Sequence, residues 1–145
     1  MKLDGSTLAA EAQKLIGCPY HFGGRSRLGG IDCAGVWVMS CQALGLQVQD
    51  LPCVPEGQDL WEQVTHLAES DCDLVDTGCH PETWEPGDLI LFRGRLMHQH
   101  MGVLVSSSPL EMVHGYQSAR KIVQQPLDES WLSRVARVYR HRGLA

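Results

Sequence analysis

A run from Cys33 to Leu44, in which nearly every residue is apolar or small, constrains the fold more than any other feature of this sequence. A helix that is apolar on all its sides is buried inside a protein. Asp32 stands just before the run, where a capping carboxylate belongs, and Gly45 follows it, where helices commonly end. The sequence therefore predicts a central buried helix with Cys33 in its first turn.

Two further helices are predicted on either side of this one. Near the N-terminus an apolar stripe recurs at helical spacing and consists of Leu8, Ala12, Leu15 and Ile16. Ser6 or Thr7 can cap this helix, and Gly17 can end it. The segment 58–68 has the pattern of a surface helix. A loop rich in glycine, 17–30, separates the first helix from the buried one.

The second half of the chain has the character of β-strands. Short apolar runs separated by turn residues follow Asp88, and they are Leu89–Phe92, His100–Val105, Glu111–Tyr116, Lys121–Val123 and Val135–Tyr139. By spacing alone, the run 128–142 fits a helix or a final strand, and Trp131 is expected in the core. Helices followed by strands favour an α+β fold, with helices on one side of an antiparallel sheet of about five strands.

Composition indicates a single domain, 1–145. The chain has 145 residues, 43% of them hydrophobic and 20% charged, which is enough apolar material for one core. No apolar run approaches the roughly 20 residues of a membrane span, and the N-terminus lacks the apolar core of a secretory signal. We therefore expect synthesis in the cytoplasm without a signal peptide, and no membrane span.

Charge is unevenly distributed along the chain. Eleven of the seventeen acidic residues lie between Asp50 and Asp88, whereas half of the twelve basic residues lie from Arg120 onward. The acidic segment is either a solvated surface or a region that attracts a substrate amine. Nucleic-acid binding is disfavoured, because no basic patch is interleaved with aromatic residues.

The six cysteines are expected to be free thiols, since no secretory signal points to an oxidising compartment. Cys33 is the candidate nucleophile, because a helix N-terminus lowers the pKa of a thiol and the preceding glycines allow substrate to approach. The other five fit structural roles better and are Cys18, Cys41, Cys53, Cys72 and Cys79. No C-x-x-C pair occurs, so no metal site is predicted, and a Cys/His metal-binding module is kept only as an alternative.

A thiol nucleophile needs a base, which is usually histidine. His100 opens a predicted strand, and Gly102 on the same face leaves room beside its ring. His114 lies in a neighbouring strand, from which it can orient His100. His98 is a candidate rim residue or half of a metal pair. The remaining four histidines resemble loop or surface residues and are His21, His66, His80 and His141.

Five segments resemble, in order, the motifs of the NlpC family of cell-wall cysteine peptidases. The sequence GCPYHFGG from Gly17 is similar to the family's G-x-P-Y-x-(F/W/Y)-G-G, and GIDCAGV from Gly30 is similar to G-x-D-C-S-G-(L/F). The segment 84–92 resembles the P-G-D-L-V-F-F strand. His100–Val103 resembles H-V-G-I, and 112–115 resembles the I-H-A element.

This resemblance implies a papain-like α+β fold, with Cys33 as nucleophile, His100 as general base and acid, and His114 as the orienting third residue. It implies that the Tyr20 hydroxyl and the Cys33 backbone N–H hold the oxyanion. We expect Asp32, Gly23, Gly24 and His98 to contact the substrate. The family's usual substrate is the peptide of peptidoglycan, often at the bond from D-γ-glutamate to a diamino acid, and no cofactor is implied. The resemblance also favours a short helical turn and then a strand at the C-terminus.

Two departures from the family pattern stand out. Ala34 replaces the usual serine after the nucleophile, and the loop between Gly24 and Asp32 is slightly longer than in many members. A bare catalytic domain without a signal peptide resembles the phage tail-associated branch of the family, which suggests phage tail proteins as partners and a location in the virion or, after delivery, at the cell wall. The alternatives are a non-catalytic tail-tip component, an amidase effector toxin, and an acyltransferase or amidase acting on lipids or other amides.

Overall fold

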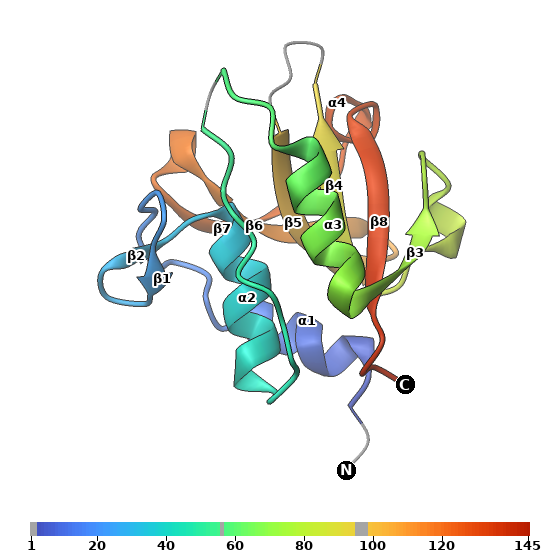
Figure 1. Cartoon of the computed structure of the whole chain (residues 1–145), viewed down its shortest axis with the longest axis horizontal. Helices are drawn as coiled ribbons and strands as arrows, with labels where there is room; N and C mark the ends of the chain where they lie inside the picture. The colour runs from blue at the N-terminus through green and yellow to red at the C-terminus, as the bar shows by residue number, and fades with distance from the viewer. Residues whose placement is uncertain (1–2, 56, 95–98) are drawn as a thin grey trace.

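The computed structural model describes residues 3–55, 57–94 and 99–145 (Figure 1). Its helices are α1 (Gly5–Gln13), α2 (Cys33–Ala43), α3 (Trp61–Asp71) and α4 (Glu129–Leu132), with short 3-10 turns η1 (Pro81–Thr83) and η2 (Gln117–Ala119). The strands are β1 (Arg25–Ser26), β2 (Gly30–Ile31), β3 (Cys72–Asp76), β4 (Leu89–Arg93), β5 (Gln99–Ser107), β6 (Leu110–Tyr116), β7 (Lys121–Pro126) and β8 (Val135–His141). None of the described helices combines the length and the apolar character needed to cross a membrane.

The main sheet has six antiparallel strands in the order β3-β8-β4-β5-β6-β7. The predicted α+β class is confirmed, and all five predicted strands are present. The sixth strand, β3, was missed because it follows α3 with no turn residue between them and two of the five residues in its sequence, CDLVD, are acidic. The C-terminal run forms α4 and then β8, as the family resemblance favours.

Strand β4 shows how the sheet separates two apolar layers. Leu89 and Leu91 face one core together with α1, α2 and α3, whereas Ile90 and Phe92 face a second core that contains Trp131. This alternation follows from the period of two in a strand. The three longer helices therefore cover one face of the sheet, as predicted (Figure 1), and α4 packs against the other through Trp131.

Helix α2 is the buried helix that the sequence predicts. Eight of its residues are buried, and it packs against β5 and β6. Its N-cap is Asp32, whose carboxylate accepts a hydrogen bond from the Gly35 N–H at 2.8 Å. Trp37 lies 1% exposed in the layer between α2 and the sheet, where its large apolar surface contributes to the core.

Some predicted helix ends were wrong. Helix α1 is capped by Asp4 rather than by Ser6 or Thr7, because the Asp4 carboxylate accepts from the Thr7 N–H at 2.9 Å. The helix also ends before Ile16, which is 44% exposed. Helix α3 is shifted by three residues at each end from the predicted range 58–68, so the residues before Trp61 belong to the irregular segment that follows α2.

The tight turn before β4 generates a prediction about stability. Gly87 has a φ of +95°, and a Cβ there would lie 2.6 Å from the Gly5 Cα, whereas Gly45 has a φ of +72° and open space around it. We expect Gly45→Ala to lower the free energy of unfolding by about 1 kcal/mol through backbone strain alone. Gly87→Ala should lower it by roughly 2 kcal/mol more, because the backbone of α1 must move. Urea unfolding of both variants measures the difference, and equal losses would refute the proposed backbone contact.

Candidate active site

The nucleophile position is built on the buried carboxylate of Asp32. Besides capping α2, this carboxylate accepts from the Gly23 N–H at 2.8 Å and from Arg25 Nη1 at 2.8 Å. Asp32 is fully buried, and the ion pair with Arg25 offsets the cost of burying its charge. The glycine-rich loop and the first turn of α2 are thereby fastened to each other, which fixes Cys33 at the first residue of the helix.

Three of the four predicted substrate-binding residues belong to this hydrogen-bonded network at the start of α2, and they are Asp32, Gly23 and Gly24. Both oxygens of Asp32 are directed toward the loop and the helix rather than toward open space. Gly23 adopts a φ of +76°. Gly24 closes a turn, because its N–H donates to the His21 carbonyl oxygen at 2.8 Å, and a Cβ there would lie 2.2 Å from the Gly30 carbonyl oxygen. These residues help to position Cys33, and their contact with the substrate stays a prediction. The fourth, His98, lies outside the described residues.

His100, on β5, is connected to His114 on β6 and then to Gln125 on β7. His100 Nε2 and His114 Nδ1 are 2.7 Å apart, and His114 Nε2 lies 2.8 Å from Gln125 Oε1. A carbonyl oxygen only accepts, so His114 Nε2–H donates to Gln125 and His114 Nδ1 is left to accept from His100 Nε2–H. His100 Nδ1 is then the nitrogen suited to act as a base, on the other side of the ring. Strands β5, β6 and β7 thus present one polar chain that ends at His100.

His114 is kept neutral by its surroundings. Its side chain is fully buried, and burial lowers its pKa to about 4, although the hydrogen bond with Gln125 acts in the opposite direction. Tyr116 stacks on its ring with centroids 5.3 Å apart, and Trp131 meets it edge-on at 5.2 Å. A neutral His114 can accept from His100 at physiological pH, which is the orienting role that the sequence predicts.

Gln125 was not predicted as a site residue. The sequence pattern placed the end of β7 at Val123, three residues too early, because Gln124, Gln125 and Pro126 have no apolar alternation. Gly102 was predicted to leave room beside the imidazole, and a Cβ there would lie 2.7 Å from Met112 Sδ and 3.4 Å from His114 Cβ. The missing side chain therefore lets β6 pack closely beside the histidine pair.

Cys33 has an unpredicted neighbour in Cys53. The two sulfurs are 3.5 Å apart, and the Tyr20 hydroxyl lies 3.8 Å from Cys53 Sγ on the other side. The hydrogen bond to Cys53 and burial raise the pKa of Cys33, whereas the hydrogen bond from Cys33 lowers the pKa of Cys53. The helix N-terminus favours a Cys33 thiolate, but the thiol contact and burial outweigh it. Cys33 is therefore a protonated thiol at rest and needs a base when it attacks.

Tyr20 lies close to both thiols. Its backbone N–H donates to the Arg120 carbonyl at 3.0 Å, which fixes the loop against the start of β7. Burial and the neighbouring Cys53 raise the pKa of Tyr20, so its hydroxyl stays protonated and able to donate a hydrogen bond. The hydroxyl is therefore in a chemical state suited to donate to an oxyanion, and that role stays a prediction of the family resemblance.

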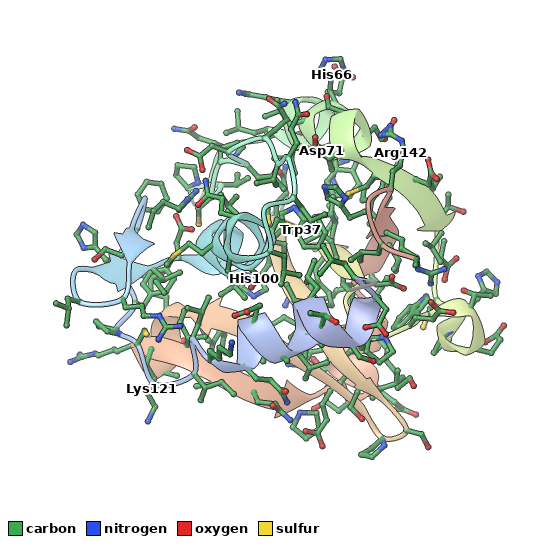
Figure 2. All side chains as sticks on the ribbon, turned by 90° about the horizontal axis from the view of Figure 1, so that it is seen from below. Trp37, His66, Asp71, His100, Lys121 and Arg142 are labelled. Carbon is green, nitrogen blue, oxygen red and sulfur yellow. The ribbon has the colours of Figure 1, made fainter. Side chains whose placement is uncertain are left out.

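Cys33 and His100 face a common groove of about 560 Å³. Its walls also include Tyr20, Cys53, Tyr116, Trp131 and Arg134. Figure 2 shows His100 beside α2, which is seen nearly end-on. At the floor, Gly115 allows β6 to reach the helix start, since a Cβ there would lie 2.9 Å from the Cys33 backbone nitrogen. The groove therefore brings a thiol, an imidazole and hydrogen-bond donors to one place.

The part of the acidic segment that includes Asp71, Asp73 and Asp76 lies away from the groove. Asp73 forms an ion pair with Arg142 at 3.2 Å, and the Asp76 carboxylate accepts from Trp84 Nε1 at 2.8 Å. Figure 2 shows Asp71 and Arg142 far across the molecule from Lys121. This agrees with the sheet order, in which β3 and β7 are the two edge strands. Among the described residues that line the groove there is no aspartate or glutamate.

Other predicted residues outside the groove have structural settings. His141 is buried rather than at the surface, and its Nε2 lies 2.7 Å from the Gln47 carbonyl oxygen. His80 forms an ion pair with Asp76 at 2.8 Å and is largely exposed. In the described ranges, no group of three or more His, Cys, Asp or Glu side chains is arranged to hold a metal ion.

A Cys–His pair at the N-terminus of a buried helix, facing an antiparallel sheet, defines the papain-like class of α+β folds. The model of the NlpC/P60 family matches residues 17–140. The chain therefore belongs to the NlpC/P60 family, whose members are generally cysteine peptidases that hydrolyse peptidoglycan. No curated protein sequence matches the chain significantly.

Solved structures share the fold at low sequence identity. An NlpC/P60 family protein from Bacillus cereus superposes with a TM-score of 0.71 at 20% identity, over 100% of this chain and 42% of that one. The NlpC/P60 domain of the peptidoglycan hydrolase SagA has a TM-score of 0.64 at 21% identity, and the match covers 94% of this chain and 97% of that one. RipD from Mycobacterium tuberculosis is described as a non-catalytic NlpC/P60 domain protein adapted to peptidoglycan binding. Its TM-score is 0.62 at 14% identity, and the match covers 94% of this chain and 95% of that one. The chain thus spans less than half of the Bacillus cereus protein and nearly all of the other two.

The buried His114 predicts how stability depends on pH. Unfolding returns its pKa from about 4 to the ordinary 6.5, so between these values the unfolded chain binds more protons. The free energy of unfolding should therefore fall as pH falls from 6.5 to 4, by roughly 3 kcal/mol from this residue. Asparagine cannot titrate in this range. In His114→Asn, the free energy of unfolding, measured with urea at several pH values, should therefore fall less steeply as the pH is lowered from 6.5 to 4.

The matched control is His66→Asn, because His66 is exposed on α3 and points away from the molecule (Figure 2). This variant should keep the pH slope of the wild type. Identical slopes for the wild type and His114→Asn would contradict a buried neutral imidazole.

Proposed function

We propose that this protein is a cysteine peptidase that cleaves an amide bond in the stem peptide of bacterial peptidoglycan, with the bond from D-γ-glutamate to a diamino acid as the expected target. The observation that carries the proposal is the groove shared by Cys33 and His100, with His100 held by His114 and Gln125. Membership of the NlpC/P60 family supports the substrate class.

The geometry supports a mechanism with general-base activation. His100 Nδ1 takes the proton of the Cys33 thiol as the sulfur attacks the scissile carbonyl carbon. The Cys33 backbone N–H and the Tyr20 hydroxyl donate to the oxyanion that forms. His100, now an imidazolium, protonates the leaving amine, and a thioester is left on Cys33. Water that loses its proton to His100 then hydrolyses the thioester and restores the thiol.

The hydrogen bond from His100 to His114 has a definite task in this cycle. It keeps the ring of His100 in one orientation and reserves Nε2–H for His114, so Nδ1 is the nitrogen that exchanges the proton. The imidazolium that forms during attack strengthens the same hydrogen bond, since a charged donor binds a neutral acceptor more tightly. Burial of His114 among Tyr116 and Trp131 keeps water from competing for this bond.

Arg134 supplies the fixed positive charge of the groove. Its guanidinium lies over the Trp131 ring, 5.1 Å from the centroid, and it is the only fixed charge among the described lining residues. An amide through the γ-carboxyl of glutamate leaves the α-carboxyl free and negative. We propose that Arg134 binds a carboxylate of the substrate, in place of the amine attraction that the acidic segment suggested.

Substitution of Arg134 tests this assignment. We expect Arg134→Gln to raise KM roughly tenfold with kcat little changed, because a hydrogen bond to a charged group contributes about 1.5 kcal/mol or more. Arg137→Gln is the matched control, since Arg137 lies on β8 and pairs with Glu69 at 3.3 Å. Steady-state kinetics on a defined muropeptide measures both. A KM for Arg134→Gln equal to that of the control would exclude a carboxylate contact.

The decisive experiment incubates the protein with defined muropeptides beside a Cys33→Ala variant and reads the products by mass spectrometry. Cleavage by the wild type alone is expected, with a loss in Cys33→Ala of at least about 10³-fold, because the nucleophile is removed. The product masses identify the bond. If the wild type binds a muropeptide and releases no product, the protein is a binding module, as RipD is described to be, and the proposal fails.

Phage tail proteins as partners, and a virion or cell-wall location, stay predictions from the sequence. An amidase of the same superfamily acting as an effector toxin would cut the same class of polymer. The product masses separate an amidase from a peptidase, because an amidase releases the whole stem peptide from the sugar.

A further inference from the structure

The contact between Cys33 and Cys53 is distinctive among the thiols of the protein. Within the described residues, these are the two cysteines whose sulfurs are in hydrogen-bonding contact, at 3.5 Å. Both side chains line the groove, so small solutes can reach the pair. Cys79 is exposed, and Cys41 and Cys72 are buried in the core. The mechanism uses Cys33 and leaves Cys53 without a role.

Arg25 holds the two cysteine-bearing segments together. Its Nη1 binds the Asp32 carboxylate, next to Cys33, at 2.8 Å. Its Nε binds the Asp50 carboxylate at 2.9 Å, and its Nη2 binds the Leu51 carbonyl at 2.8 Å, two residues before Cys53. One guanidinium therefore ties the start of α2 to the irregular segment 46–55, which carries Cys53. The approach of the two thiols is a built feature of the fold rather than a chance contact of mobile side chains.

We propose that Cys33 and Cys53 form a reversible disulfide on exposure to a hydroperoxide, which makes this pair a thiol modification site at the nucleophile. The sulfurs must approach from 3.5 Å to the roughly 2.05 Å of a disulfide. Cys53 lies outside any helix or strand, so its side chain and backbone can follow this movement while Cys33 stays fixed by its helix.

The chemistry balances with a hydroperoxide as oxidant. The Cys53 thiolate attacks the distal oxygen and the O–O bond breaks, so that Cys53 becomes a sulfenic acid. The alkoxide that leaves takes up the proton that Cys53 lost on ionising and becomes an alcohol (water, if the oxidant is hydrogen peroxide). Cys33 then attacks the Cys53 sulfur, the S–O bond breaks, and the hydroxide that leaves takes the Cys33 proton to become water. Two thiols lose two electrons, and the peroxide gains them. Cys53 is the first to react, since it is the more exposed of the two and the hydrogen bond from Cys33 lowers its pKa.

The expected consequence is an oxidised protein that is inactive and protected. The disulfide blocks the Cys33 sulfur and protects it from irreversible oxidation to sulfinic acid. Thiol reductants then restore the free Cys33 thiol. The loss of activity rests on the proposed peptidase function, whereas the bond itself does not.

Peptide mapping tests the bond directly. The wild-type protein is exposed to about one equivalent of hydrogen peroxide, blocked with iodoacetamide, and digested without reductant. We expect a cross-linked Cys33–Cys53 peptide, loss of iodoacetamide labelling at Cys33, and recovery of labelling after dithiothreitol. Muropeptide cleavage, followed in parallel, should disappear and return with the labelling.

Two variants make the result specific. In Cys53→Ser, the same exposure should leave Cys33 open to labelling, and circular dichroism verifies that this variant is folded. Cys79→Ser should behave as the wild type, because Cys79 lies at the exposed surface away from the pair. Absence of the cross-linked peptide, or equal loss of Cys33 labelling in Cys53→Ser, would overturn the proposal. A cross-link in the oxidised protein, together with no muropeptide cleavage by the reduced protein, would support the disulfide and refute the peptidase function.

Discussion

The arrangement of the site depends on one buried carboxylate. Asp32 caps α2 through the Gly35 N–H, holds the loop through the Gly23 N–H, and pairs with Arg25, which in turn binds the segment ahead of Cys53. A charge at zero exposure is tolerated only when its oxygens are fully used, and here three donors meet that condition. The loop, the helix start and the neighbouring segment are thus fixed relative to one another by a single side chain. The position of Cys33 follows from this network more than from the helix alone.

The second support of the site comes from the sheet. Three adjacent strands each contribute one member of a polar chain, and the chain passes from Gln125 through His114 to His100. The two hydrogen bonds fix the tautomers, because the Gln125 carbonyl oxygen only accepts and His114 Nδ1 is left to accept from His100. The aromatic side chains of Tyr116 and Trp131 exclude water from this chain. Helix and sheet meet at Gly115, where the absence of a side chain brings the two supports into direct backbone contact.

Local signals in the sequence predicted the parts of the fold that short-range physics controls. The apolar run and its capping aspartate predicted α2 and Cys33, and alternation in the strands predicted the position of His114 beside His100. What could not be predicted depends on contacts between distant segments. The approach of Cys53 to Cys33 and of Gln125 to His114 requires the chain to be folded. Asp4 competed with Ser6 and Thr7 as a cap, and β3 became a strand only because β8 offers it a partner.

The position of β8 has a consequence for how the chain is assembled during translation. This strand lies between β3 and β4, although it is the last of the described elements to leave the ribosome. Until it arrives, β3 has no neighbour, and β4 presents an unpaired edge to solvent beside the strands that hold the histidines. Insertion of a late strand into the interior of a sheet requires closure of a long loop, which slows folding. A nascent chain of this protein therefore depends on its final strand before the sheet beneath the site is continuous.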